Sequence, residues 1–213
     1  MEVIILAGGQ GRRLRPLTSD MPKCMVPVNG MPMLQYHLNW LKKYDIDKII
    51  VSCGYMWEKI KKHYGNAFVY SVEEEPLGTG GAIKLALERV EGNEFIVVNS
   101  DDINDANLNK FAKLGSNAIA LSRFHCQFGI VEEENGVVKK FVQKPLLPYW
   151  ANMGLYLLNK KVPLPEKGAL ETETLPKIKL KAYKHDGFWM TVNTLKELEE
   201  LEKALKGRNY EKA

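Results

Sequence analysis

Segments with the pattern of β-strands alternate with segments that have the pattern of α-helices along the first hundred residues. The strand-like segments are short apolar runs, and the helix-like segments place apolar residues three and four positions apart. In order they are strand 3–7, helix 33–44, strand 47–52, helix 56–64, strand 68–72, helix 79–90 and strand 95–98. This alternation predicts an α/β fold, in which a mostly parallel sheet is covered by helices and binds ligands at the carboxyl ends of its strands.

The first strand ends abruptly in a glycine-rich loop. Gly8, Gly9 and Gly11 follow the apolar run, and glycines there let backbone N–H groups come close to a phosphate or a purine edge. Cationic side chains follow in the same segment, at Arg12, Arg13, Arg15 and Lys23. Because a guanidinium group can bind phosphate oxygens in a bidentate way, the segment predicts a polyphosphate site.

The glycine loop matches neither of the two common phosphate-binding motifs. The P-loop ending Gly-Lys-Ser/Thr is absent, and Leu14 stands where the dinucleotide motif has its third glycine. Two further strands end in segments with polar or glycine-rich sequence, 73–81 and 99–102. Since the carboxyl ends of parallel strands share one edge of a sheet, we expect these segments to lie beside the glycine loop.

The second half of the chain is less regular. A turn at 133–136 is flanked by the strand-like runs 128–132 and 137–142, which predicts a hairpin. Later segments are strand 152–158, a proline-broken connection 161–167, strand 183–189 and amphipathic helix 195–205. Because no shift in composition marks a linker, we expect one α/β domain over residues 1–213 with an inserted antiparallel portion.

Composition excludes several classes of function. The formal charge of +4 is spread along the chain without a dense basic tract, so no nucleic-acid partner is expected. No stretch approaches the roughly 20 apolar residues of a membrane span, and the amino terminus lacks the order of a signal peptide. We therefore expect no membrane association and a cytoplasmic location. Cys24, Cys53 and Cys126 lack a CxxC spacing, so neither a disulfide nor a zinc site is predicted.

The glycine loop is part of a longer pattern. Residues 6–18 read Leu-Ala-Gly-Gly-x-Gly-x-Arg-Leu-x-Pro-Leu-Thr, and residues 22–28 read Pro-Lys-x-Met-x-Pro-Val. Together they resemble the signature of the sugar-1-phosphate nucleotidyltransferases, also called nucleotide-sugar pyrophosphorylases. The resemblance extends from residue 1 to about residue 205 and implies a Rossmann-like fold.

The resemblance also implies an activity. The family transfers a nucleoside monophosphate from a nucleoside triphosphate to a sugar 1-phosphate and releases pyrophosphate. Residues 75–82 read Glu-Pro-Leu-Gly-Thr-Gly-Gly-Ala and are most similar to the mannose-1-phosphate and heptose-1-phosphate guanylyltransferases, which favours GTP. Glu74 or Glu75 could accept the N1–H and N2–H of guanine. A uridylyl- or thymidylyltransferase acting on glucose 1-phosphate remains an alternative.

Roles in nucleotide binding and catalysis follow from the same resemblance. It implies catalytic functions for Arg13, which would grip the triphosphate, and for Lys23, which would steady the phosphates. Asp101 lies in Asn-Ser-Asp, in place of the family's Asn-Gly-Asp, and would be catalytic as the ligand of Mg²⁺, the expected cofactor. The implied nucleotide-binding residues are Leu6, Ala7, Gly8, Gly9, Gly11, Glu75, Gly78 and Thr79.

The resemblance places sugar recognition in the second half of the chain. Phe128-Gly129, residues 141–145, Asn152-Met-Gly154 and the acid at 171 resemble segments around the family's sugar pocket. The implied sugar-phosphate-binding residues are Gly129, Gln143, Lys144, Asn152 and Glu171. We therefore expect a nucleotide-binding half at about 1–115 and a sugar-binding half at about 116–213.

The sequence departs from the family pattern at functional positions. Residues 187–194 read Gly-Phe-Trp-Met-Thr-Val-Asn-Thr, so Thr191 replaces the second metal-binding aspartate and Asn193 replaces a glycine. Gln143 replaces a sugar-binding glutamate, although its carbonyl oxygen can still accept a hydrogen bond. These changes raise the alternative of a catalytically weak, nucleotide-sugar-binding regulatory subunit. The expected partners are a nucleoside triphosphate and a sugar 1-phosphate, with a second copy of the chain in a homodimer.

Overall fold

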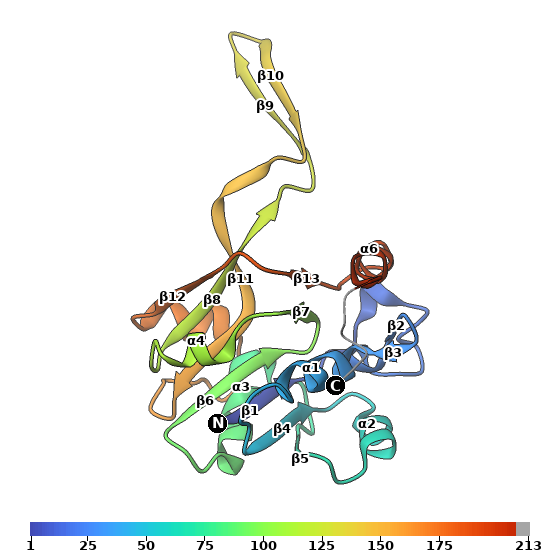
Figure 1. Cartoon of the computed structure of the whole chain (residues 1–213), viewed down its shortest axis with the longest axis vertical. Helices are drawn as coiled ribbons and strands as arrows, with labels where there is room; N and C mark the ends of the chain where they lie inside the picture. Colours follow the sequence, from blue (N-terminus) through green and yellow to red (C-terminus); the bar gives the residue numbers. More distant parts are fainter. Residues whose placement is uncertain (208–213) are drawn as a thin grey trace.

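The computed structural model describes residues 1–207 and is built on a seven-stranded sheet (Figure 1). The strand order is β12-β8-β11-β6-β1-β4-β5. These strands are β12 (Lys181–His185), β8 (Ala118–His125), β11 (Leu146–Asn159), β6 (Glu94–Asn99), β1 (Glu2–Leu6), β4 (Lys48–Cys53) and β5 (Val69–Val72). Neighbouring strands are parallel except where β11 pairs with β6 and β8. The predicted mostly parallel α/β sheet is confirmed.

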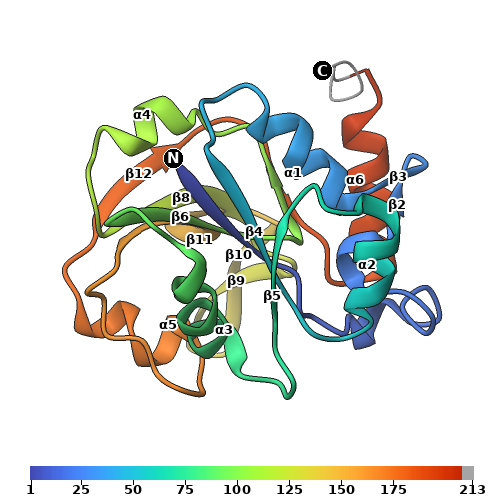
Figure 2. The ribbon, with the colours of Figure 1, turned by 90° about the horizontal axis from the view of Figure 1, so that it is seen from below.

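Helices cover both faces of the sheet (Figure 2). Val3 and Ile5 of β1 belong to a core shared with α1 (Met33–Leu41), α2 (Trp57–Tyr64) and α4 (Leu108–Ala112). Ile4, between them, belongs to a second core shared with α3 (Gly78–Ala86) and α5 (Leu170–Glu173). Because successive side chains of a strand point to opposite faces, an uninterrupted apolar run is what a strand buried on both sides requires.

A third core lies outside the large sheet. Helix α6 (Leu195–Leu205) buries Leu198, Leu201 and Leu205 against Val26 and Val28. Two short strands, β2 (Pro27–Val28) and β3 (Met31–Pro32), form a small antiparallel pair beside it. Thr194 and Glu197 form a capping box that fixes the first turn of α6. Among the described residues no helix is both long and apolar enough to cross a membrane.

The predicted strand at 183–189 is wrong in one respect, because the chain turns in its middle. Strand β12 ends at His185, and β13 (Trp189–Thr191) pairs instead with β7 (Asp102–Asn104). Asp105 holds the turn, since its carboxylate accepts from Phe188 N at 2.8 Å and its backbone N–H donates to Phe188 O at 3.1 Å. This turn brings Thr191 into register with Asp102, at the carboxyl end of the sheet.

The predicted hairpin is confirmed, and it projects from the body of the molecule (Figure 1). Strands β9 (Gly129–Glu134) and β10 (Val137–Gln143) are joined by Asn135 and Gly136, with φ values of 53° and 78°. Two successive residues with positive φ are typical of the turn that matches the twist of a tight hairpin. We call residues 126–145, which comprise this hairpin and its connections to β8 and β11, the arm.

Candidate functional site

A cavity of about 790 Å³ opens at the carboxyl ends of β1, β4, β5 and β6. This volume is in the range of small-molecule sites. The structure brings together the three strand-end segments that the sequence indicated, and it adds the segment after β4. The lining residues are Leu6, Gly8, Gly9, Gln10, Gly11, Arg12, Lys23, Ser52, Gly54, Tyr55, Glu73, Glu74, Glu75, Pro76, Gly78, Thr79, Ala82, Asn99, Ser100 and Asp101.

The glycine loop is closed by a tight turn at Gly11. Its φ is +61°, and a Cβ there would lie 2.9 Å from Thr18 Cγ2 and 3.0 Å from Lys23 Cβ. Thr18 donates its hydroxyl hydrogen to Gly11 O at 2.8 Å, which ties the loop to the segment that carries Lys23. A side chain at position 11 would therefore push apart the two segments that line this side of the cavity.

Two cations meet at a single amide oxygen. Lys23 is 8% exposed; it forms an ion pair with Asp101 and donates to Asn193 Oδ1 at 2.9 Å. Arg13 Nη2 donates to the same oxygen at 2.9 Å. The amide of Asn193 donates in turn to Thr191 Oγ1 at 3.1 Å. Thr191 and Asn193, which depart from the family pattern, are thus connected to the predicted catalytic residues Arg13 and Lys23.

The two neighbouring arginines have different surroundings. Arg12 lines the cavity and donates from Nε to Gln10 Oε1 at 3.0 Å, although the sequence pattern assigns it no role. Both arginines are exposed, but Arg13 is not among the lining residues and is held to Asn193. The short 3-10 turn Arg12–Leu14 determines which of the two faces the cavity.

Asp102 is a buried acid next to the cavity wall. Its carboxylate accepts hydrogen bonds from Asn99 Nδ2 and Trp189 Nε1, both at 3.1 Å. Burial, reinforced by the neighbouring charge of Asp101, raises the pKa of Asp102 to about 7. Gly154, a bulge residue on β11 with φ +68°, leaves the space that this carboxylate occupies, since a Cβ there would lie 2.2 Å from Asp102 Oδ2.

Oxygen atoms suited to a hard cation are present beside the cavity. Asp101 has a carboxylate on the wall, and the buried Oδ1 of Asn99 has no hydrogen-bond partner. Within residues 1–207, no three His, Cys, Asp or Glu side chains are grouped closely enough to hold a metal by themselves. This donor set matches Mg²⁺, which commonly takes one or two protein oxygens and completes its shell with phosphate oxygens and water.

The loop after β5 is connected to the second half of the chain by hydrogen bonds. Thr79 donates to Glu171 Oε2 at 2.7 Å, and Tyr156 donates to the other carboxylate oxygen at 3.2 Å. Asn152 Nδ2 donates to the Tyr156 hydroxyl at 2.6 Å. Asn152 and Glu171, predicted to contact the sugar, are therefore linked to Thr79, predicted to contact the nucleotide.

None of the five predicted sugar-phosphate-binding residues lines the cavity, and only Asn152 and Glu171 are joined to it, through the hydrogen bonds that lead to Thr79. Gly129, Gln143 and Lys144 lie on the arm, and Gln143 and Lys144 are exposed. Their assignment to the sugar phosphate stays a prediction. Ala7 is buried beneath the glycine loop and does not line the cavity.

Some lining residues were missed from the sequence. Gln10, Ser52, Gly54, Tyr55 and Ala82 line the cavity without having been predicted, and Glu73 was predicted only as part of the segment 73–81. The signal for the segment 52–55 was available, because it directly follows strand 47–52 and parallel strands end at the same edge. Glu73 lies between two glycines: a Cβ at Gly8 would be 2.7 Å from its Oε1, and one at Gly54 would be 2.6 Å from its Cγ.

Comparison with known proteins identifies relatives of the whole chain. Heptose-1-phosphate guanylyltransferases of the D-glycero-α-D-manno type from Campylobacter jejuni and Aneurinibacillus thermoaerophilus are 36% and 35% identical to it. The first alignment covers 90% of this chain and 94% of the relative, and the second covers 83% and 84%.

Solved structures are also similar to this chain over most of its length. HddC from Yersinia pseudotuberculosis is similar with a TM-score of 0.77 and 29% identity, over 96% of this chain and 99% of that one. The same protein has also been solved in complex with GMP-PN. The sequence model of the nucleotidyl transferase family matches residues 2–203. The chain belongs to the nucleotidyl transferase family.

Proposed function

We propose that this protein transfers GMP from GTP to a manno-configured heptose or hexose 1-phosphate, releasing pyrophosphate and forming a GDP-sugar. The observation that carries the proposal is the cavity at the strand ends, where a glycine loop, Lys23 and Asp101 share one wall. The names of the relatives in Campylobacter and Aneurinibacillus support the choice of GTP and of a heptose phosphate.

The proposed site uses both halves of one domain. The nucleotide-binding half, about residues 1–115, carries the cavity with Leu6, Gly8, Gly9, Gly11, Glu75, Gly78 and Thr79. The sugar-binding half, about 116–213, contributes Asn152 and Glu171, which the hydrogen bonds through Tyr156 join to Thr79. The last six residues of this proposed domain, 208–213, lie outside the described part of the chain.

The chemistry is an in-line displacement at phosphorus. An oxygen of the sugar 1-phosphate attacks the α-phosphorus of GTP, the bond from that phosphorus to the bridging oxygen breaks, and pyrophosphate leaves with that oxygen. Such a reaction requires positioning and charge neutralisation more than covalent participation by the protein. Lys23 and Arg13 supply two positive charges, and the shared contact with Asn193 Oδ1 fixes their separation before substrate arrives.

We propose that the cofactor is Mg²⁺, with Asp101 as its protein ligand and Asn99 Oδ1 beside it. The bound ion would neutralise charge on the phosphate oxygens during transfer. In the described structure Asp101 is paired with Lys23. The ammonium group of Lys23 thus lies beside the carboxylate that would hold the ion, where it could bind the phosphates.

We propose that the acids of segment 73–75 select guanine. Glu73 is the least exposed of the three, and Glu75 is exposed and paired with Lys167 at 3.0 Å. Burial raises the pKa of Glu73, while a hydrogen bond from Leu77 N opposes that rise. A carboxylate accepts from the N1–H and N2–H groups of guanine, and uracil and thymine have no amino group to offer.

We also propose that the protein works in the cytoplasm, where nucleoside triphosphates are made, and that it acts as a homodimer.

A nucleotide-sugar-binding regulatory subunit is the second candidate function. It is favoured by Thr191, which faces Asp102 across the β13–β7 pair where a second acidic ligand is expected.

The test is pyrophosphate release by the purified protein with Mg²⁺. Each of GTP, UTP, dTTP and ATP is crossed with mannose, glucose and D-glycero-α-D-manno-heptose 1-phosphates. Release with GTP and a manno-configured sugar supports the proposal. Release with UTP or dTTP and glucose 1-phosphate would replace it by the alternative enzyme. No release from any pair, together with binding of a GDP-sugar by calorimetry, would favour the regulatory subunit.

A further inference from the structure

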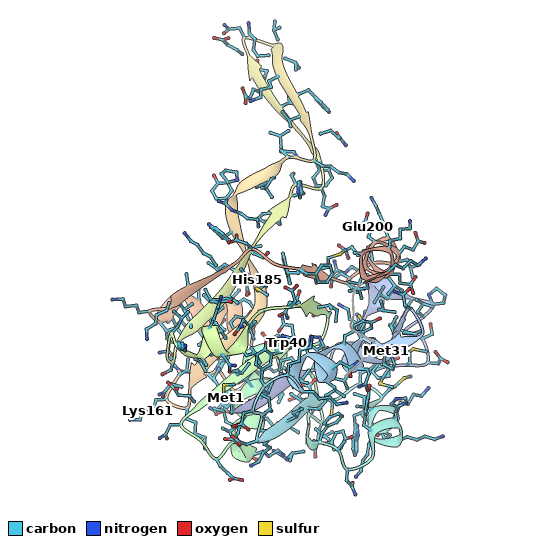
Figure 3. The ribbon with its side chains drawn as sticks, viewed as in Figure 1. Met1, Met31, Trp40, Lys161, His185 and Glu200 are labelled. Atoms are coloured by element: carbon cyan, nitrogen blue, oxygen red, sulfur yellow. The ribbon has the colours of Figure 1, made fainter. Side chains whose placement is uncertain are left out.

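The arm presents apolar side chains to solvent along its whole length (Figure 3). Phe128, Phe141 and Val138 are 76%, 62% and 59% exposed. The pairing of Val131 with Phe141 puts these two side chains on one face of the hairpin, together with Val138. A two-stranded hairpin with an uncovered apolar face is marginally stable in water, so packing against a partner surface would stabilise it.

The two sides of the arm stay paired where they join β8 and β11, although the register of β11 on β8 shifts between Leu146 and Trp150. Leu146 pairs with His125, Cys126 N donates to Pro145 O at 2.9 Å, and Lys144 N donates to Phe128 O at 3.2 Å. His125 Nδ1 also donates to Lys144 O at 2.9 Å. In this conformation the arm projects away from the body of its own chain (Figure 1). A second copy could approach the arm with all of these hydrogen bonds intact.

The base of the arm is anchored as well. The guanidinium of Arg123 lies 4.3 Å from the ring centre of Trp150, and the ammonium of Lys184 lies 5.2 Å from it. Arg123 Nη1 also donates to Leu147 O at 3.4 Å. Cation–π contacts of this kind stiffen the place where β8 and β11 leave the sheet. These contacts at the base of the arm therefore help to set its direction.

We propose that two copies of this chain exchange arms, so that each arm completes the sugar-phosphate site of its partner with Lys144 and Gln143. This inference rests on the proposed function. One chain by itself holds Asn152 and Glu171 near Thr79 but carries Lys144 and Gln143 on the exposed arm, so its site is incomplete. A two-fold axis makes the exchange reciprocal and gives two complete sites per dimer.

The charge of the arm is compatible with a second copy as the occupant. The arm carries three glutamates, Glu132, Glu133 and Glu134, and three lysines, Lys139, Lys140 and Lys144, so its formal charge is zero. Two arms brought together consequently meet no net repulsion. Lys144 has a φ of 48°, an uncommon conformation for a residue with a side chain, directly after the strand end where the predicted phosphate contact lies.

The test is complementation between two inactive variants. Asp101→Asn damages the body and leaves the arm intact. Lys144→Asn damages the arm, and asparagine tolerates the positive φ at this position. After co-expression, half of the randomly paired dimers are heterodimers, and one of the two sites in each heterodimer combines an intact body with an intact arm. An equal mixture with random pairing should then recover about one quarter of wild-type turnover with GTP and heptose 1-phosphate.

Controls separate the possible outcomes. Lys139→Ala, on the neighbouring strand β10 and paired with Glu134 at 3.6 Å, should keep wild-type turnover. Sedimentation velocity should show a dimer for the wild type and a monomer for Phe141→Ser, and this variant should lose turnover. An active wild-type monomer, or a mixture no more active than its two components, would overturn arm exchange while leaving the proposed function intact. A wild-type protein that is inactive with every substrate pair would overturn the proposed function and the shared site together.

Discussion

Asn193 Oδ1 accepts a hydrogen bond from Lys23 Nζ at 2.9 Å across 170 residues of sequence. Arg13 Nη2 donates to the same oxygen, also at 2.9 Å. The second amide atom, Nδ2, donates to Thr191, so the orientation of the amide is fixed from both sides. A glycine here, as the family pattern has, could make none of these side-chain contacts. Asn193 therefore positions both predicted phosphate-binding cations in the free protein.

Replacing Asn193 by alanine should lower kcat/KM for GTP about ten- to hundredfold. A hydrogen bond to a charged group contributes about 1.5–3 kcal/mol, and about 1.4 kcal/mol corresponds to a factor of ten. Steady-state kinetics will measure the change. Asn109→Ala, at an exposed position on α4, is the matched control and should be neutral. Unchanged kinetics in Asn193→Ala would show that the tether has no role in turnover.

The sheet and the location of the cavity could be predicted from the sequence because they rest on local patterns. The run from Val3 to Ala7 is apolar throughout, as a strand buried on both faces must be, and the glycines after it mark its end. The clustering of three strand-end segments then follows from parallel topology alone. These inferences need no knowledge of how distant side chains meet.

Other features depend on contacts between residues far apart in the sequence. The turn after His185 is fixed by Asp105, which no local pattern around 183–189 reveals. Which of Arg12 and Arg13 faces the cavity depends on a short 3-10 turn and on Asn193. The hairpin itself was predictable from its turn residues, but its direction was not, because the anchoring of Trp150 by Arg123 and Lys184 is a tertiary contact.

Gly154→Ala should destabilise the fold strongly. Alanine at φ +68° costs about 1–2 kcal/mol, and its Cβ would lie 2.2 Å from Asp102 Oδ2, which adds about 1–3 kcal/mol of overpacking. Gly136→Ala is the matched control, because φ there is +78° but a Cβ would meet nothing within 4 Å. Chemical denaturation should give a clearly larger loss for Gly154→Ala. Equal losses would mean that the space beside Asp102 is not required.

His37 should make stability depend on pH between about 4 and 6.5. Burial lowers the pKa of this imidazole to about 4, although a hydrogen bond to Ser100 O opposes the change. The unfolded chain therefore binds the extra proton first as the pH falls. The free energy of unfolding should decrease through this window by at most about 1.4 kcal/mol per pH unit from this group.

His37→Gln should remove that part of the slope, because glutamine stays neutral and can still donate to Ser100 O. His63→Gln, at an exposed position, is the control and should leave the slope unchanged. Urea denaturation at a series of pH values measures both. If the wild type and His37→Gln have parallel stability curves from pH 4 to 6.5, then His37 does not titrate as described.

Glu73→Gln should weaken the preference for GTP about ten- to hundredfold, since it removes a charged acceptor at the cavity wall worth about 1.5–3 kcal/mol. Glu75→Gln is the comparison on the same loop. Its carboxylate is exposed and paired with Lys167, so a smaller effect is expected. The readout is kcat/KM for GTP relative to UTP. A larger effect from Glu75→Gln would move the base contact to that residue.

The central claim is that guanylyl transfer takes place in the cavity beside Asp101. Its most direct test compares pyrophosphate release by the wild type and by Asp101→Asn, with GTP, D-glycero-α-D-manno-heptose 1-phosphate and Mg²⁺, after circular dichroism has shown that both are folded. The account predicts rapid release by the wild type and a loss of at least about a hundredfold in the variant, about 2.7 kcal/mol of transition-state stabilisation. Near-normal release by Asp101→Asn would contradict it.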